Sequence, residues 1–371
     1  MAEIPPGRRE HHTTLRDIAQ RASVSTGTVS RVMNNKAGID EQLRGRVQHI
    51  AAEMGYIPRT QSGSKRIGMY LREIERTAEY NTYFSRIIYG VQAECRRRGW
   101  QFVFGSIGES REAQLEFSRA IHGTQLDGLI LENVLRREVV ETALGTGLPV
   151  VVVDDDYPDL PIEYVNHDAY GGALLAMRYL LAQGHQRIGL LAGPAEHINV
   201  RRRLAAYRDA LSEATIAYDP ALVAQSDLSV DGGERATAHL LASRTTVTAI
   251  FCSNDCSAIG ALRALRAAGV QVPGDISVMG FDDIESARLV SPALTTVRVA
   301  MEDVGVAAVQ ALSDRLYHPQ RPYSTRLLHT SLIMRDSVCH ARLNGDSSHP
   351  RSSTIEGNEH IAPRKAVMSA T

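Results

Sequence analysis

Apolar residues follow two different spacings along the chain, and the change falls near Ile67. Before it, apolar side chains recur every three or four residues. This predicts three short helices, one over TTLRDIAQRA, one that begins after Ser25, and one from about Asp40 to Met54. After it, short continuous apolar runs such as LPVVVV alternate with amphipathic helical segments. Strands buried on both faces have this character, so the larger part of the chain is predicted to form parallel sheets covered by helices.

The three predicted helices carry signals at their boundaries. Thr14 and Asp17 have the spacing of a capping box, Ser25 can cap the second helix, and Pro58 prevents the third from continuing. Leu15, Ile18, Ala19 and Ala22 form one apolar stripe on the first helix. Two helices joined by the short turn SVS and supported by a third are predicted to be a helix-turn-helix unit.

The start of the second helix is rich in small residues. Most of them are mediocre helix formers, and they are Ser25, Thr26, Gly27, Thr28 and Ser30. In a helix-turn-helix this part of the helix enters the major groove, where small groups permit a close approach and Arg31 can reach a guanine edge. The alternative is a plain three-helix bundle with hydroxyl groups on its wet face. The coincidence of cap, turn, small residues and basic charge favours DNA binding.

Charge is distributed unevenly along the chain. Eleven Lys and Arg against six Asp and Glu give residues 1–66 a net charge of +5, whereas all 371 residues together carry −1. A basic head on an acidic body favours a polyanionic partner for the head. We find no secretory signal and no apolar run of the roughly 18–20 residues that cross a bilayer. Four cysteines do not form a disulfide framework in a chain of this length, so we expect a cytoplasmic protein without membrane contact.

Polar residues gather at the predicted strand ends of the body, where ligands of parallel sheets bind. They are Asn133, Asp154, Asn199, Asn254, Asp255 and Asp282, with Arg203 in a helix that follows one strand. Amides, carboxylates and one guanidinium suit a polyhydroxyl ligand, and Tyr83 and Phe84 could stack on it. For any single residue, an ordinary wet loop explains the polarity equally well.

Enzyme and metal sites find less support in the sequence. No G-x-G-x-x-G follows a strand, no G-x-x-x-x-G-K occurs, and FGSIG does not fit G-x-S-x-G. For Asp154–Asp156 a solvated loop is favoured over a metal site, and for Cys252 and Cys256 two semi-buried thiols are favoured over a zinc site. We therefore expect no enzyme activity and no cofactor.

The segment TLRDIAQRASVSTGTVSRVMN resembles the DNA-binding head of the lactose/galactose/purine repressor family of bacterial transcription regulators. The resemblance implies that Thr26, Gly27 and Arg31 read bases. It also implies a set of residues that hold the sugar–phosphate backbone, namely Thr14, Leu15, Ser25, Thr28, Ser30 and Asn34. Gly27 departs from the family pattern because glycine makes no side-chain contact with a base.

The segments RRRLAAY, SPALTTVR and FCSNDCSAIGALRALRAAGVQVPGDISVMGFDD extend the resemblance to about Val338. They imply a two-lobed periplasmic-binding-protein-like sensor with an effector in the cleft. The residues implied to line that cleft are Tyr83, Phe84, Asn133, Asn199, Arg203, Asn254 and Asp282. Leu228 stands where several relatives place an aromatic residue. Family members have a longer linker with a leucine that enters the minor groove, and this chain lacks such a leucine.

Together these observations predict an all-α helix-turn-helix head joined to an α/β two-lobed body. The expected organisation is a disordered N-terminus at 1–11, the head at 12–58, a linker at 59–66, a body for effector binding and dimerisation at 67–339, and a disordered tail at 340–371. Crossings between the lobes are expected near Ile162–Val165, Asp282–Leu289 and Thr295–Ala300.

The expected function is that of a ligand-responsive transcription regulator, most often a repressor in such proteins. It should bind a palindromic double-stranded DNA operator as a homodimer or larger assembly. Helices near 83–99 and 111–122 are the candidate dimer interface. The effector is expected to be a sugar or sugar derivative, with a nucleobase as the second choice. The bacterial nucleoid is the expected place of the DNA-bound form. The alternative is a sugar-binding protein whose DNA-binding head is vestigial.

Overall fold

A computed structural model describes residues 14–33, 38–54, 64–73, 80–108, 110–243 and 246–341. Asn34, most of the predicted linker and the segments 1–13 and 342–371 lie outside these ranges. The head contains α1 (Leu15–Ala22), α2 (Thr26–Met33) and α3 (Glu41–Glu53). Its small core contains the fully buried side chains of Ile18, Val29 and Val47. The predicted capping box is confirmed, because the Thr14 side chain accepts from the Asp17 amide and the Asp17 carboxylate accepts from the Thr14 amide.

The first lobe is a six-stranded parallel sheet in the order β11-β5-β4-β3-β1-β2. Its strands are β1 (Arg66–Arg72), β2 (Gln101–Ile107), β3 (Gly128–Glu132), β4 (Val150–Val153), β5 (Glu163–His167) and β11 (Thr325–Leu328). Successive residues of the central strands point to opposite faces, so Met69 and Tyr70 belong to two different hydrophobic clusters. Both faces of this sheet are therefore core, as the continuous apolar runs predict.

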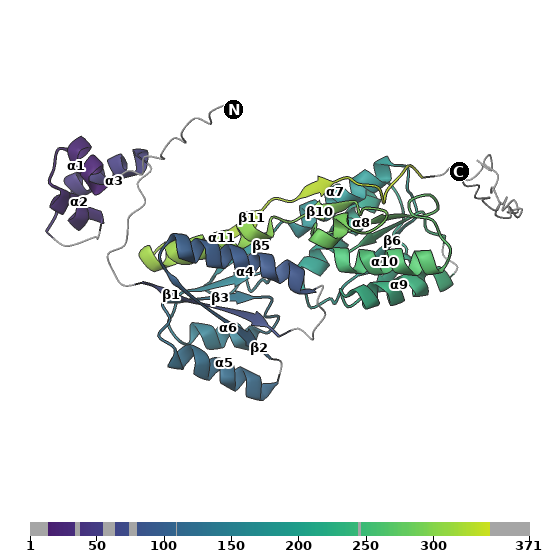
Figure 1. Ribbon diagram of the computed structural model, residues 1–371, viewed down its shortest axis with the longest axis horizontal. Coiled ribbons are helices and arrows are strands. Elements are labelled where there is room, and N and C mark those ends of the chain that lie inside the picture. Colours follow the sequence, from purple (N-terminus) through teal and green to yellow (C-terminus); the bar gives the residue numbers. More distant parts are fainter. Residues whose placement is uncertain are drawn as a thin grey trace, which may run out of the picture.

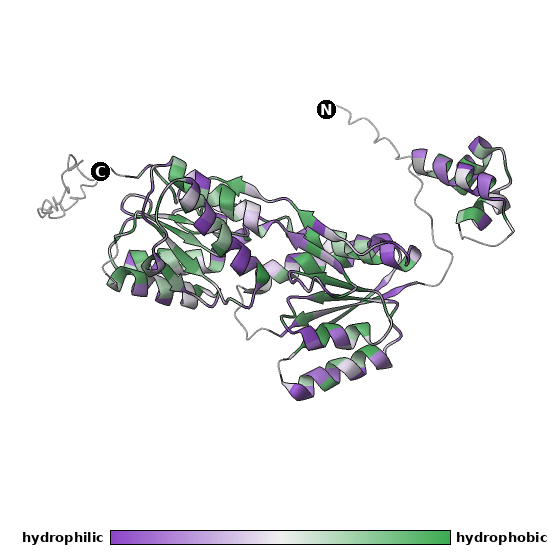
Figure 2. Cartoon of the chain, turned by 180° about the vertical axis from the view of Figure 1, so that it is seen from behind, coloured by the Kyte–Doolittle hydropathy of each residue, from purple (hydrophilic) through white to green (hydrophobic). Residues whose placement is uncertain are grey.

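Two pairs of helices cover the two faces of that sheet. The helices are α4 (Tyr80–Arg97), α5 (Arg111–Gly123), α6 (Arg137–Leu144) and α11 (Met301–Tyr317). In Figure 1, α4 and α11 lie on one face and α5 and α6 on the other. Hydrophobic residues are concentrated on the strands and on the helix sides that face them (Figure 2). This layered packing holds the carboxyl ends of the parallel strands β3, β4 and β5 side by side at the same end of the sheet.

The second lobe contains a four-stranded parallel sheet in the order β7-β6-β8-β9 and an antiparallel pair, β10 and β12. Its strands are β6 (Ile188–Ala192), β7 (Val223–Gln225), β8 (Ala249–Cys252), β9 (Ser277–Met279), β10 (Thr296–Arg298) and β12 (Ser331–Ile333). Its helices are α7 (Ala169–Ala182), α8 (Ile198–Glu213), α9 (Val230–Ala242), α10 (Asp255–Ala267) and the short turns η1 (Pro220–Leu222) and η2 (Glu285–Arg288).

The chain passes between the lobes after β5, between β10 and α11, and between β11 and β12. The first crossing follows His167, just beyond the expected Ile162–Val165, because Glu163–His167 forms the buried strand β5 of the first lobe. The sequence did not predict this strand, because the polar residues of IEYVNHD do not fit the pattern of a buried strand. Segment 282–289 stays with the second lobe, because Asp283 forms ion pairs there with Arg298 and Arg335 at 2.7 and 2.5 Å.

Both ends of the body differ from the expected boundaries. Lys65, counted with the linker, places its ammonium group 2.8 Å from the Asp127 carboxylate, and Arg66 begins β1. Ala341, counted with the tail, donates its backbone N–H to the Gln183 carbonyl at 2.8 Å. Among the helices of the described residues, none combines the length and apolar character that spanning a bilayer requires.

Candidate functional site

The first candidate site is the N-terminal half of α2, the predicted DNA-reading helix. Thr28 donates its backbone N–H to the Ser25 hydroxyl oxygen at 3.0 Å, so Ser25 caps the helix as predicted. Val29 and Val32 are buried against the rest of the head, whereas Thr26, Gly27 and Arg31 are exposed on the other side. The helix is thus anchored by one face and leaves these three residues accessible.

The other residues predicted to contact DNA lie on or near this helix, and some of them are only partly exposed. Thr14 is exposed, and its hydroxyl donates to the Asp17 carboxylate at 2.7 Å. Leu15 is half-buried against the core of the head, and Ser30 is half-buried on α2. Asn34 lies outside the described residues.

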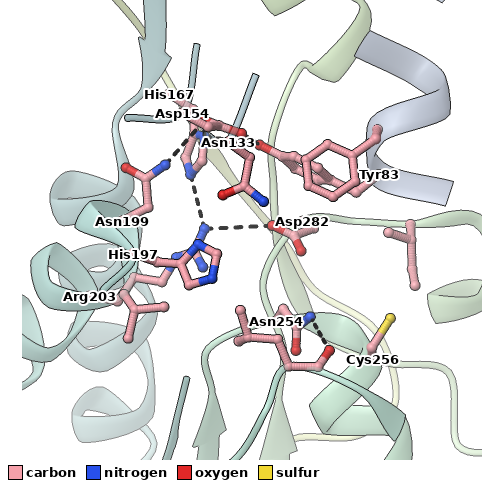
Figure 3. A pocket seen from close by; sticks show the side chains of 14 residues that line it. Tyr83, Asn133, Asp154, His167, His197, Asn199, Arg203, Asn254, Cys256 and Asp282 are labelled. Carbon is pink, nitrogen blue, oxygen red and sulfur yellow. Dashed lines mark hydrogen bonds and ion pairs between the residues drawn. The ribbon is translucent and has the colours of Figure 1, made fainter. Parts of the chain in front are cut away.

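The second candidate site is a cavity of about 70 Å³ between the lobes (Figure 3). All seven predicted effector residues line it. Tyr83 and Phe84 come from α4, Asn133 follows β3, Asn199 and Arg203 lie on α8, Asn254 caps α10, and Asp282 follows β9. The fold brings these residues together because the carboxyl ends of the strands of both sheets face the same space.

Asp154, which follows β4, is the centre of the hydrogen bonds around the cavity. One carboxylate oxygen accepts from Asn199 Nδ2 and from His167 Nδ1, each at 3.1 Å. The other accepts from the Tyr83 hydroxyl at 2.5 Å. Because Asn199 belongs to the second lobe, Asp154 links the lobes directly (Figure 3).

Arg203 supplies the second direct link between the lobes. Its Nη1 donates to the Ser253 carbonyl at 2.8 Å, and its Nη2 lies 3.0 Å from His167 Nε2. Since a guanidinium only donates, His167 accepts at Nε2 and its proton lies on Nδ1, which faces Asp154. The Arg203 guanidinium carbon also stacks 4.0 Å above the ring of Phe281. These contacts fix the orientation of Arg203 before any ligand contact is made.

Burial shifts the titration of several groups around the cavity. It acts to raise the pKa of Asp154, but His167, Tyr83 and Arg203 outweigh it and hold that pKa below its usual value. Burial raises the pKa of Asp282 well above its usual value, and Asp255 and Asp154 add to the rise although Arg203 opposes it. Burial, together with Arg72 and Arg203, lowers the pKa of His197 to about 4, so His197 is neutral near pH 7.

Four buried polar atoms on the predicted effector residues have no hydrogen-bond partner within the described part of the chain. They are Asn133 Nδ2, Asn199 Oδ1, Arg203 Nε and Asp282 Oδ1. Asp282 Oδ1 lies 3.7 Å from Arg203 Nη2, which is an ion pair but too long for a hydrogen bond. Leaving such atoms unpaired is costly, so a ligand that pairs with them gains binding energy.

Backbone strain gathers at the same place. Asn133, Asp154, Leu228 and Asp282 line the cavity with φ values of 51°, 57°, 69° and 113°. Non-glycine residues rarely adopt positive φ, and such strain accumulates at ligand sites. The strained turns aim the side chains of Asn133, Asp154 and Asp282 at the cavity.

Sequence reasoning missed or misjudged several of the cavity residues. His167 and His197 line the cavity, yet no motif marked them, and Cys256 lines it although it was considered only as a thiol. The solvated loop favoured for Asp154–Asp156 is wrong, because Asp154 and Asp155 are buried and hydrogen-bonded. Cys252 and Cys256 form no disulfide and are buried rather than semi-buried. Within the described residues, no group of three or more His, Cys, Asp or Glu side chains could hold a metal ion.

Comparison with known proteins gives two matches to family models. Residues 14–59 match the bacterial regulatory proteins of the lacI family, and residues 177–338 match a periplasmic binding protein-like domain. The chain is 32% identical to the ribose operon repressor of Haemophilus influenzae over 332 residues, which cover 88% of this chain and 98% of the relative.

Solved structures give the same result. A transcriptional regulator CelR–cellobiose complex is 31% identical, with a TM-score of 0.69 over 88% of this chain and all of that one. A lac repressor dimer bound to operator and an anti-inducer is 28% identical, with a TM-score of 0.67 over 88% of this chain and 99% of that one. The similarity therefore spans the head and both lobes.

Proposed function

This chain belongs to the lacI family of bacterial regulatory proteins, and from that membership and the cavity we propose that a small sugar-like effector controls how tightly its head binds DNA. The protein is thus a ligand-responsive, sequence-specific transcription regulator. The relatives to which it is similar include the ribose operon repressor and the transcriptional repressor PurR, and we propose that this protein is also a repressor.

The proposed DNA contacts lie on and around α2. Thr26, Gly27 and Arg31 are exposed at the start of the helix, which is where a helix-turn-helix reads base edges. Thr14, Leu15, Ser25, Thr28, Ser30 and Asn34 are the proposed contacts to the sugar–phosphate backbone. In this proposal residues 12–58 bind DNA, residues 67–339 bind the effector and dimerise, and the DNA-bound protein lies on the nucleoid.

We propose a homodimer that binds a near-palindromic operator. One head of this size makes too few base contacts for tight specific binding, and two heads about one DNA turn apart solve the problem. The lac repressor, to which this chain is similar, was solved as a dimer on its operator. The exposed Tyr89 on α4 and Leu115 on α5 make these helices the proposed interface.

The observation that carries the effector proposal is the set of unpaired donors and acceptors in the cavity. Side chains from both lobes surround the ligand position, so an effector stabilises the closed arrangement of the lobes. An effector changes DNA affinity only through its different affinity for two arrangements of the protein, typically a coupling of about 1–3 kcal/mol.

Selection of bound DNA from a random pool by the purified protein, with and without a panel of sugars and nucleobases, tests this function. We expect one near-palindromic sequence whose recovery changes with one compound. If no sequence is recovered while a compound still binds, the protein is a ligand-binding protein with a vestigial head, and the proposed function is wrong.

A further inference from the structure

We infer that the first lobe itself binds DNA, through contacts between arginines at its end opposite the cavity and the sugar–phosphate backbone. This end, here called the basal face, comprises the starts of β1, β2 and β3 and the ends of α4, α5 and α11. In Figure 1, β1 begins at the end of the lobe where these three helices end. The inference rests on the proposed function, because the head brings this face to the DNA.

The head is tethered close to the basal face. The last described residue of the head is Met54, and ten residues later Ser64 donates its hydroxyl to the Gly99 carbonyl at 2.9 Å, two residues after α4. At about 3.3–3.6 Å for each residue, this stretch spans at most about 35 Å. A tether this short keeps the basal face at a high effective concentration beside DNA that the head holds, so contacts that are weak alone contribute to binding.

Three arginines of the basal face are available to bind an anion. Arg96 lies in the last turn of α4, Arg119 lies near the end of α5, and Arg321 follows α11. All three are exposed, and none of them has an ion-pair partner among the residues that the structure describes. Three positive charges at one end of the lobe are complementary to a phosphate backbone.

Carboxylates of the same region are already neutralised by other cations. The pairs are Glu94 with Arg97 and Arg98, Asp127 with Lys65, and Asp314 with Arg326. Glu116, one turn before Arg119, is exposed and has no such partner within the described ranges. The available charge of the basal face is therefore positive.

The rest of the body has the opposite charge. Residues 1–66 carry +5 and the whole chain carries −1, so residues 67–371 carry −6. An acidic body is repelled by DNA, and that repulsion acts against a head on a short tether. A basic face at the end next to the tether offsets it, and this is the end at which the three arginines lie.

Helix ends alone do not explain this charge. A basic residue in the last turn stabilises its helix through the helix dipole, which accounts for a residue such as Arg96. Arg321, however, lies in a turn outside the helix, between the exposed side chains of Tyr317 and Tyr323. The Arg315 guanidinium carbon stacks 3.9 Å from the Tyr323 ring and fixes its position. Arginine and tyrosine side chains are both common donors to phosphate oxygens.

The salt dependence of DNA affinity tests the inference. Wild type, Arg96→Gln, Arg321→Gln and the double variant are titrated, as full-length proteins, with the selected operator and with the unselected random duplex pool. Each phosphate contact contributes about 0.9 to the slope of log affinity against log salt concentration. For each protomer on DNA, we expect the slope to become less steep by about 0.9 in the single variants and about 1.8 in the double variant. The change should be the same on both DNAs, because phosphate contacts carry no sequence information.

Arg111→Gln is the matched control. Arg111 is also exposed, but it begins α5 at the cavity end of the same lobe. Since salt screens exposed charges beyond about 10 Å at 0.1 M, this variant should keep the wild-type slope. A wild-type slope in the folded double variant overturns the inference, and so does an equal change in Arg111→Gln.

The two DNAs separate this inference from the proposed function. If the slope changes on the random pool but no operator is ever selected, the basal face binds DNA and the proposed function fails. If an operator is selected and responds to an effector while the variants keep the wild-type slope, the proposed function holds and the inference fails. Wild-type protein that binds neither DNA overturns both.

Discussion

Arg31 is the side chain on which base recognition should depend most. It is exposed on α2, one turn beyond the small residues that allow a close approach to DNA. Replacing Arg31 by Ala should weaken specific operator binding by about 1–3 kcal/mol, the usual contribution of a good arginine–guanine contact. Footprinting checks this, with Arg21→Ala as the control because Arg21 is also exposed but lies on α1. An unchanged footprint for Arg31→Ala would exclude base reading by this residue.

Arg203 should separate the ligand response from DNA binding. It touches Ser253, His167 and Asp282 at the cavity and is far in sequence from the head. The Arg203→Ala variant should keep its affinity for the operator, but the effector should no longer change that affinity. Arg201→Ala, on the same helix but exposed and bonded to the Ala195 carbonyl, should keep the response. A normal response in both variants would show that the cavity is not the effector site.

Asp255 should give the unfolding free energy a distinctive pH dependence. This fully buried carboxyl accepts from Thr296 Oγ1 at 2.5 Å and from the Ile284 N–H at 2.9 Å. Burial raises its pKa to about 7, and Asp283 adds to the rise. As pH increases from about 4 to 7, the unfolded state loses this proton before the folded state does, so the contribution of Asp255 to the stability of the folded state falls over that range.

Comparing wild type with Asp255→Asn isolates that contribution. Denaturant unfolding between pH 4 and 8 should show the stability difference moving in favour of the variant up to about pH 7 and then levelling off. A difference that is constant with pH would contradict the raised pKa.

Cavity residues could be predicted from the sequence where they directly follow a strand or begin a helix. Asn133, Asn254 and Asp282 stand at such positions, and the fold gathers them at one cavity. His167 and His197 were not predictable from local pattern. Their place at the cavity depends on the packing of β5 against β4 and of α8 against α7, which are contacts distant in sequence.

At the scale of whole elements, helix pairs cross closely at glycines in both lobes. A Cβ atom on Gly90 of α4 would lie 2.1 Å from the Glu302 carbonyl of α11. A Cβ atom on Gly260 of α10 would lie 2.0 Å from the Val230 carbonyl of α9. Because backbone rather than a flexible side chain occupies the space, the helices must separate to admit any other residue.

Gly90→Ala should therefore destabilise the body by about 1–3 kcal/mol or more, the usual effect of overpacking. Gly123→Ala is the matched control, because no atom lies within 4 Å of a Cβ atom there. It should be neutral or stabilise by up to about 1 kcal/mol. Urea unfolding of both variants decides the point, and equal stabilities would show that α4 and α11 can adjust at no cost.

Helices and strands whose apolar residues follow one clear spacing were predictable. Strands that form only by pairing with a segment distant in sequence were not. Strands β1 to β4, β6 and β8 follow from apolar runs, and helices α4 to α8 and α10 follow from amphipathic spacing. Strand β5 reads as polar because Glu163, Asn166 and His167 are buried in it, and Glu163 is paired with Arg315 of α11. Strands β10 and β12 are three residues each and exist only as an antiparallel pair. Pairing across long sequence distances was therefore the missing information.

For the molecule as a whole, the body should be complete at Ala341. Ser337 accepts from the Thr295 N–H at 2.8 Å and donates to the Val278 carbonyl at 2.6 Å. Ala341, the last described residue, donates its backbone N–H to the Gln183 carbonyl. Residues 342–371 are polar and lack periodicity. Deleting 342–371 should leave melting temperature and operator affinity nearly unchanged, whereas deleting 337–371 should lower the melting temperature. A large loss from the shorter deletion would show that the tail docks on the body.

Among the described residues, three hydrogen bonds join the lobes through protein atoms alone: Asn199 to Asp154, Arg203 to His167 and Arg202 to Asp156. They favour closure at every effector concentration, so part of the protein is closed before any effector binds. The difference in operator affinity between effector-free and effector-saturated protein therefore depends on the strength of these bonds as much as on the effector. Selection for a wider range of response would act first on the residues that make them.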